Sequence, residues 1–147
     1  MRVLTVRQPW AWAIIFQGKD IENRSTNIAG AYRGPIAIHA GSKYDKASWK
    51  MYKETAPTSP AHIGESLKDA VYGQIIGVVD LVDVHRSVPG DRGNDAHCNS
   101  TCSPWAFDTS VYHLVLANPR PIQPIPYTGF LGLRKIVDPL VLEHLQS

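Results

Sequence analysis

The chain has 147 residues, a net charge of +2 and an apolar fraction of 44%. These values are typical of one globular domain, so we expect a single domain over residues 1–147 and exclude a disordered chain. The apolar runs are far too short to cross a bilayer, and no membrane segment is expected. The first residues lack a signal-peptide core and the two cysteines cannot form a secreted disulfide scaffold, which together favour a cytoplasmic protein.

The basic residues are unevenly distributed along the chain. Residues 1–55 contain nine Lys and Arg against four acidic residues, whereas the remaining residues carry a net charge of −3. The imbalance favours either a face for an anionic partner such as nucleic acid or a solvated surface without a partner. Charge alone does not separate these two interpretations.

Hydrophobic periodicity and the positions of Gly and Pro predict the secondary structure. In chain order, the first half predicts a strand over 2–6, a helix over 9–17, an extended segment over 20–24, a loop over 27–30, a strand over 34–41 and a helix over 43–54. The second half predicts a break over 55–60, a helix over 62–71, a strand over 74–85, a polar loop over 87–104, a strand over 111–117, a Pro-rich connector over 118–126, a strand over 130–137 and a helix from Asp138. This order favours an α+β fold, a small mixed β-barrel of five to six strands with two to four flanking helices.

Several segments resemble the ASCH domain of the PUA-like superfamily. They are Thr5–Trp12, Gly18–Ser25, Tyr32–Ala40, Ile76–Val84, Ser103–Ala106, His113–Leu116 and Gly129–Leu133. The resemblance covers almost the whole chain. It implies a PUA-like barrel with a cleft that binds RNA or a modified nucleobase.

The family motif is Gly-x-Lys-x-x-Glu-x-Arg. Lys19, Glu22 and Arg24 keep its spacing, although Gly18 directly precedes the lysine. Glu22 and Arg24 lie two residues apart in an extended segment, so their side chains share a face. Lys19 can reach this face only from the turn between the predicted helix and the extended segment. A carboxylate between two cations could hold a base edge and a phosphate together. The alternative is an ordinary surface ion pair.

Aromatic and polar residues outside the motif are further candidates for nucleic-acid contacts. We expect Gln8 and Trp10 to line the cleft and Trp12 to fill the core. Trp105 follows the long polar loop and is either a stacking platform or an anchor for that loop. His39 ends a strand and either donates to phosphate or is a structural group.

Basic residues toward the end of the basic half are candidates for phosphate contacts. The predicted helix over 43–54 carries a stripe formed by Lys43, Lys46, Lys50 and Lys53, which Arg33 could extend. A solvated helix face is the alternative interpretation of the stripe.

We expect no cofactor and no metal ion. His97, Cys98 and Cys102 offer three soft ligands, which His85 or Asp95 could complete to four. Zinc sites more often combine two separate ligand pairs, and this chain has a single pair of cysteines. A pair of reduced loop thiols is therefore the default interpretation.

The resemblance leaves an enzyme open as the alternative to a binding module. Some relatives are amidohydrolases that deacylate a modified cytidine with a lysine, a threonine three residues later and a distant glutamate, but here that position is Glu22. A ribonuclease, an activity linked to other relatives, would use Lys19, Glu22 or His39 as general acid and base. We predict a module that binds RNA or modified nucleic acid, with hydrolysis of RNA or of an acylated cytidine nucleoside as the alternative. The sequence does not predict the oligomeric state.

Overall fold

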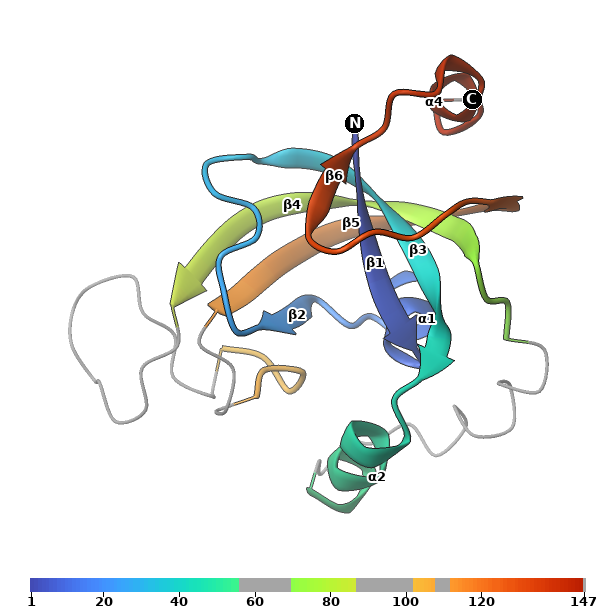
Figure 1. The fold of residues 1–147 in the computed structure, drawn as a ribbon. Coiled ribbons are helices and arrows are strands. Elements are labelled where there is room, and N and C mark those ends of the chain that lie inside the picture. Colours follow the sequence, from blue (N-terminus) through green and yellow to red (C-terminus); the bar gives the residue numbers. More distant parts are fainter. Residues whose placement is uncertain (56–69, 87–101, 108–111, 147) are drawn as a thin grey trace.

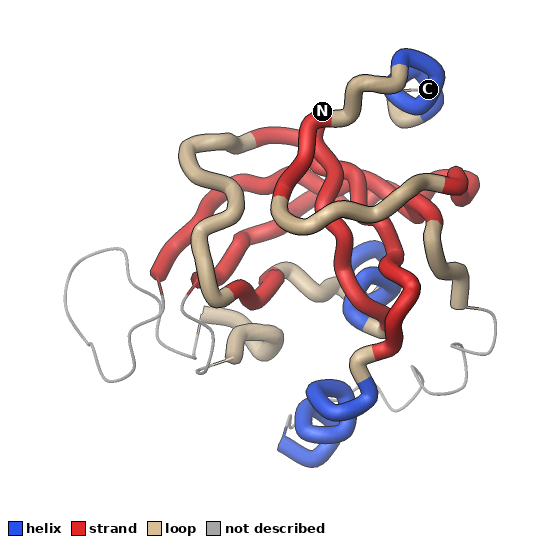
Figure 2. The backbone as a smooth tube through the Cα atoms, in the orientation of Figure 1, coloured by secondary structure: helices blue, strands red, loops and turns tan. Residues whose placement is uncertain are grey.

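The computed structural model describes residues 1–55, 70–86, 102–107 and 112–146. These residues form six strands and three helices (Figures 1 and 2). In chain order they are β1 (Arg2–Gln8), α1 (Trp10–Phe16), β2 (Ile21–Arg24), β3 (Gly34–Tyr44), α2 (Lys46–Thr55), β4 (Gln74–Arg86), β5 (Tyr112–Pro126), β6 (Leu133–Lys135) and α4 (Pro139–His144). Within these described ranges, no helix has the length and hydropathy that a membrane crossing requires.

The six strands form one mixed sheet in the order β2-β5-β4-β3-β1-β6. β1 runs parallel to β3, and the other pairings are antiparallel. The sheet is strongly curved in Figure 1, but β2 and β6 each pair with one neighbour in the described part of the chain, so the sheet is not closed into a barrel. These edge strands have only four and three residues. The predicted α+β class with six mixed strands is confirmed, and barrel closure is not.

The larger hydrophobic core lies between α1 and one face of the sheet. Five of the seven α1 residues are buried, and they pack against apolar side chains from β1, β3, β4 and β5 such as Leu4, Ile38 and Leu81. Gly77 permits the close approach of α1, because a Cβ at this position would lie 2.6 Å from Ile15 Cδ1 and 2.8 Å from the Arg120 carbonyl oxygen. The apolar surface on nearly all sides of α1 therefore reflects its burial.

A smaller core lies on a second side of the sheet and includes the C-terminal helix. Its buried members are Val3, Ala37, Ile75, Val78, Ile136 and Leu145. The Asp138 side chain caps α4 by accepting hydrogen bonds from the backbone N–H groups of Leu140, at 2.9 Å, and Val141. The cap satisfies donors at the helix start and fixes the direction in which the C-terminal residues pack.

Two predicted boundaries differ from the structure. β3 extends to Tyr44, which pairs with Gln8 of β1, so the helix predicted over 43–54 begins at Lys46. The predicted Pro-rich connector over 118–126 is the second half of β5. Its prolines are compatible with a strand because β2 pairs only with Tyr112–Val115, so that among the described residues the rest of β5 pairs with β4 alone.

Three other predicted segments are shorter in the structure or lie mostly outside the described residues. The strand predicted over 130–137 is reduced to Leu133–Lys135, the three residues that pair with β1. Most of the helix predicted over 62–71 lies outside the described residues, and the same is true of most of the polar loop over 87–104.

Candidate functional site

A pocket of about 510 Å³ lies where the two edges of the curved sheet approach each other. Arg24 on β2 donates from Nη2 to the Thr5 carbonyl oxygen on β1 at 3.0 Å and so links these edges. That carbonyl lies beyond the three residues that β1 pairs with β6. The lining residues are Thr5, Val6, Arg7, Trp10, Lys19, Glu22, Asn23, Arg24, Asp45, Ser48, Met51, Phe107, Phe130, Leu131 and Gly132. The volume is in the usual range for small-ligand sites.

The three motif residues converge on one wall of this pocket. Glu22 Oε2 lies 3.1 Å from Lys19 Nζ, and Glu22 Oε1 lies 3.0 Å from Arg24 Nη2. Gly18 adopts a positive φ of 69° after α1 and turns the chain so that Lys19 reaches β2. The Lys19 ammonium also donates to the Ile21 carbonyl oxygen. Each carboxylate oxygen therefore accepts from one cation, which is the shared geometry expected from the spacing.

Burial makes this cluster different from a surface ion pair. Lys19 and Glu22 are 3% and 8% exposed, whereas the Arg24 side chain is 26% exposed. Burial lowers the pKa of Lys19, the Glu22 carboxylate partly opposes this effect, and the nearby Arg24 adds a smaller decrease in the same direction as burial. A buried amine with a lowered pKa beside a carboxylate is a group from which a proton can be removed more easily than from a solvated lysine.

Aromatic rings form the adjoining wall. Trp10 Nε1 donates to Asp45 Oδ2 at 3.1 Å, which fixes the indole at the start of α1. The Trp10 ring meets Phe107 edge to face at a centroid distance of 5.8 Å, and Lys19 Nζ lies 5.7 Å from the centroid of Trp10. The pocket thus places a flat apolar surface beside a charged cluster.

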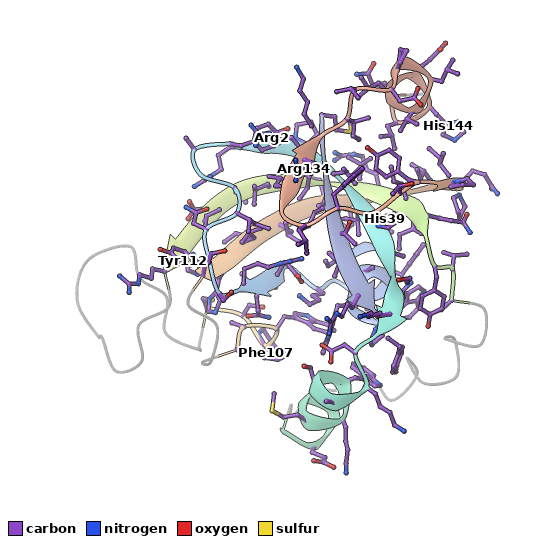
Figure 3. All side chains as sticks on the ribbon, in the orientation of Figure 1. Arg2, His39, Phe107, Tyr112, Arg134 and His144 are labelled. Atoms are coloured by element: carbon purple, nitrogen blue, oxygen red, sulfur yellow. The ribbon has the colours of Figure 1, made fainter. Side chains whose placement is uncertain are left out.

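The loop before β6 forms an exposed apolar edge of the pocket, in which Phe130 is 48% and Leu131 is 91% exposed. The Thr5 hydroxyl accepts from the Phe130 backbone N–H at 3.1 Å and lies 3.2 Å from His39 Nδ1. His39, which Figure 3 labels, in turn lies with Nε2 2.9 Å from the Tyr127 carbonyl oxygen. Since a carbonyl only accepts, Nε2 carries the proton and Nδ1 accepts from Thr5.

Through these hydrogen bonds the buried His39 holds the loop before β6 in place. His39 does not line the pocket. Burial lowers its pKa and favours the neutral ring that these hydrogen bonds require. Gly129 lies so close that a Cβ there would be 2.6 Å from His39 Cε1. Of the two interpretations of His39, this geometry matches the structural one.

Two other residues expected at the cleft are structural in their contacts. Gln8 is fully buried outside the pocket lining, where Oε1 accepts from the Trp12 backbone N–H and Nε2 donates to the Val71 carbonyl oxygen, both at 3.0 Å. Trp105 is buried away from the lining, and its carbonyl oxygen accepts from Asn23 Nδ2 at 2.9 Å. Trp12 packs only half-buried against the core instead of filling it.

The expected lysine stripe is shorter than the sequence predicted. Lys46 and Lys50 are exposed and lie one turn apart on α2, which also supplies Ser48 and Met51 to the pocket. Lys43 is on β3 because that strand continues past the predicted helix start. The side chain of Lys53 lies outside the described residues, and Arg33 pairs with Asp83 at 3.7 Å without lining the pocket.

The cysteine prediction also needs a correction. Cys102 is disulfide-bonded, so it is not the reduced thiol that we expected. His97, Cys98 and Asp95 lie outside the described residues. The Cys102 sulfur lies near His85, which was among the expected ligands, and near His113, which was not.

Several lining residues were not predicted from the sequence. Thr5 and Arg7 share one face of β1 by strand periodicity, and this alternation was the available signal. Asn23 lies between two motif residues. Phe107 and Phe130 reach the pocket from segments far along the chain, and no local pattern marks them.

The fold is similar to solved ASCH structures. The ASCH protein of Zymomonas mobilis matches 99% of this chain and 92% of its own at 15% identity and a TM-score of 0.51. A tyrosine-to-phenylalanine mutant of that protein matches 97% and 94% at 17% identity and the same TM-score. No protein-family model and no curated protein match the chain. The likeness confirms an ASCH-type fold, as the sequence resemblance implied.

Proposed function

We propose that this chain binds nucleic acid and holds one base or modified base in the pocket. The observation that carries the proposal is the buried Lys19–Glu22–Arg24 cluster, which adjoins the Trp10 and Phe107 rings in a cavity of about 510 Å³. A heterocycle combines a flat apolar face with polar edges. The same combination of rings and charged groups is suited to binding it.

The charges of the pocket favour an anionic ligand. Lys19 and Arg24 neutralise Glu22, and the only other acidic residue of the described lining is Asp45, which accepts from Trp10. Arg7 is exposed at the same pocket and adds a further positive charge. Arg24 Nε is buried and has no hydrogen-bond partner among the described residues, so it is a donor available to a ligand after a small local movement. These groups favour a phosphate beside the base.

A strand of nucleic acid could continue from the pocket along α2. Lys46 and Lys50 are exposed on this helix, whose Ser48 and Met51 border the pocket. Exposed lysines contact phosphate without reading sequence, whereas the pocket would select the base. Affinity should therefore depend strongly on salt, while base preference should depend on the pocket.

Binding of short fluorescent RNA and single-stranded DNA oligonucleotides, measured by anisotropy at several salt concentrations, tests this proposal. Arg7→Ala should weaken binding to all sequences and reduce the salt slope by about 0.7, the value for one lost phosphate contact on a single strand. Phe107→Ala should weaken binding by about 1–3 kcal/mol through lost stacking. Arg120→Ala, which removes a surface arginine outside the pocket, is the matched control. Affinity that does not change with salt, or equal effects of Arg7→Ala and Arg120→Ala, would contradict the proposal.

A hydrolase is the second candidate, and the lowered pKa of the buried Lys19 favours it. The amine could exchange a proton at a bound substrate while Glu22 holds it in place at 3.1 Å. The purified chain should then convert an RNA oligonucleotide or an acylated cytidine nucleoside to product, and Glu22→Gln should abolish the conversion. Time courses without product for either substrate class would eliminate the hydrolase and leave the binding module.

A further inference from the structure

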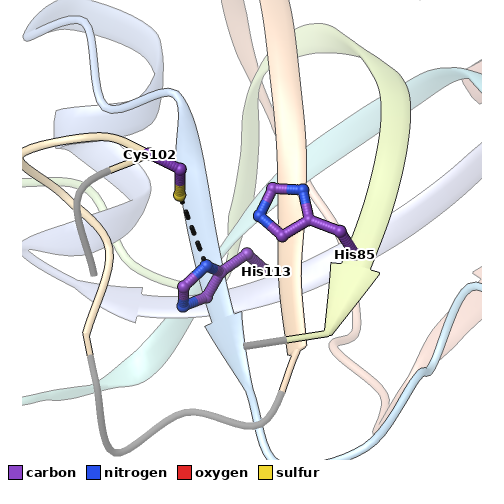
Figure 4. Close-up of side chains that lie close together, drawn as sticks. All are labelled: His85, Cys102 and His113. Carbon is purple, nitrogen blue, oxygen red and sulfur yellow. Dashed lines mark hydrogen bonds between the residues drawn. The ribbon is translucent and has the colours of Figure 1, made fainter. Parts of the chain in front are cut away.

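Three potential metal ligands gather outside the pocket. His85 lies near the end of β4, His113 near the start of β5, and Cys102 at the start of the segment 102–107 (Figure 4). One ligand atom of each residue lies within 4.8 Å of the other two. None of the three lines the pocket described above. This cluster therefore needs an explanation of its own.

The sheet places the two imidazoles together. His85 and His113 are direct partners in the antiparallel β4–β5 pairing, a position that brings side chains on one face into contact. Their rings lie 5.3 Å apart between centroids at an interplanar angle of 79°. His113 is fully buried, His85 is 13% exposed in its side chain and Cys102 is exposed, so the cluster is anchored in the sheet and open to solvent on one side.

The hydrogen bonding of His113 fits a metal ligand. Its Nε2 lies 3.2 Å from the Phe107 carbonyl oxygen and its Nδ1 lies 3.5 Å from Cys102 Sγ. The carbonyl requires a proton on Nε2, which leaves the lone pair of a neutral ring on Nδ1 facing the sulfur. Once Cys102 is reduced and deprotonated, a cation between Nδ1 and the sulfur would bind the lone pairs of both, and a backbone carbonyl on the far nitrogen is the usual partner of a metal-bound histidine.

His85 has a comparable partner on its far side. The Asp83 carboxylate lies 3.9 Å from His85 Nδ1. Figure 4 shows the His85 ring turned with its other edge toward Cys102 and His113. A carboxylate beside one ring nitrogen orients the imidazole and increases the basicity of the other nitrogen, which is Nε2 here.

We propose that the chain in its thiol form binds Zn²⁺ through Cys102 Sγ, His113 Nδ1 and His85 Nε2, with the fourth position open to solvent or another ligand. In tetrahedral zinc sites the Zn–S and Zn–N bonds place sulfur and nitrogen about 3.6 Å apart. The Sγ–Nδ1 distance of 3.5 Å already matches this separation. One thiolate and two imidazoles favour zinc over Mg²⁺ or Ca²⁺, which prefer oxygen ligands.

Binding requires a change at Cys102, which is disulfide-bonded in the structure. A phosphine reductant supplies two electrons to the S–S bond, takes up oxygen from water and leaves two thiols. The Cys102 thiol then releases its proton to solvent as the sulfur binds zinc. The oxidised chain should not bind zinc at this site.

A bound ion would fix both ends of the segment 102–107. It would hold Cys102 directly and the Phe107 carbonyl through His113 Nε2, at 3.2 Å. Zinc should therefore raise the melting temperature of the reduced chain. This inference is independent of what the pocket binds, so it stands or fails separately from the proposed function.

The test is zinc binding to the full chain, reduced with a phosphine under nitrogen and then dialysed against Zn²⁺. We expect one ion per chain by elemental analysis, a higher melting temperature and, with Co²⁺ as the probe, absorption bands of a tetrahedral thiolate site. Cys102→Ser and His85→Gln should each weaken binding by more than about tenfold. The matched control is His144→Gln, an exposed histidine on α4 that should have no effect.

The opposite results would overturn the site. These are a reduced wild-type chain that retains no zinc at micromolar concentration, equal zinc binding by the oxidised and reduced chains, or loss of zinc that is no greater in Cys102→Ser and His85→Gln than in His144→Gln. Because His85 and Cys102 are not among the buried core residues, we expect both variants to fold. Circular dichroism of the metal-free chains checks this.

Discussion

Replacement of Glu22 by glutamine tests the charged cluster most directly. The carboxylate accepts from Lys19 at 3.1 Å through one oxygen and from Arg24 at 3.0 Å through the other. A glutamine has the same shape but only one acceptor oxygen. Its NH₂ group must therefore face one of the two cations at about 3 Å, donor against donor. The substitution removes the charge that compensates the buried Lys19 ammonium and leaves the packing unchanged.

The expected loss of stability follows from the burial of the pair. Removal of one partner from a buried ion pair costs about 3–5 kcal/mol because the remaining charge is left unpaired. The Arg24 side chain is 26% exposed, so water screens part of its loss, and we expect about 3 kcal/mol for the variant. For a domain of this size, that corresponds to a decrease of roughly 6–12 °C in melting temperature.

Thermal and urea unfolding followed by circular dichroism measure this difference. Asp80→Asn is the matched control, since Asp80 pairs with Arg120 at 2.7 Å on the surface and makes the same change from acid to amide. A surface pair contributes at most about 1 kcal/mol. If Glu22→Gln costs no more than Asp80→Asn, the cluster is not the buried and mutually dependent unit described above.

Two further predictions concern the same pocket. The folded state holds the pKa of Lys19 below its usual 10.5, so between the folded-state pKa and 10.5 the unfolded chain binds more protons than the folded chain. Wild type should therefore gain stability relative to Lys19→Met as the pH rises through this range. Urea unfolding at several alkaline pH values measures the difference, and a decrease over that range would contradict the assignment. Gly129→Ala places a Cβ 2.6 Å from His39 Cε1 and should destabilise the chain by about 1–3 kcal/mol while moving the loop that carries Phe130. Urea unfolding with unchanged stability would show that this close approach is unimportant.

The features that the sequence predicted correctly depend on neighbours in the chain. Strand periodicity placed Glu22 and Arg24 on one face, and Gly18 between helix and strand brought Lys19 to them. The helix predicted over 9–17 and the helix start at Asp138 follow from residues within one or two turns. Local patterns of this kind are visible in a single sequence because the interactions that produce them are local as well.

Features that depend on register or on distant segments were not predicted. The β4–β5 pairing has three register shifts between Gln74 and Arg86, and these decide that His85 faces His113. The prolines after Asn118 indicated a connector, because the sequence did not show that this part of β5 has a neighbour on only one side. Phe107 and Phe130 meet the pocket through tertiary contacts alone.

The walls of the pocket are positioned mainly by polar side chains and only partly by the apolar core. Thr5 and His39 hold the loop at Phe130. The Asn23 side-chain amide holds the segment 102–107 at two points. Its Nδ2 donates to the Trp105 carbonyl oxygen and its Oδ1 accepts from the Phe107 backbone N–H, each at 2.9 Å. Such contacts have strict directions, so they fix the orientation of the loops more closely than apolar packing does.

It follows that pocket shape and global stability should respond to different substitutions. A smaller residue in the core, such as Ile38→Val, should cost about 0.5–1.5 kcal/mol and leave the pocket walls in place. Asn23→Ala removes both hydrogen bonds that orient the segment carrying Phe107, on an edge strand with one paired neighbour. Its main effect should therefore be on ligand affinity. Buried polar groups thus orient the loops that complete the pocket, whereas most of its other lining residues lie on β1, β2, α1 and α2.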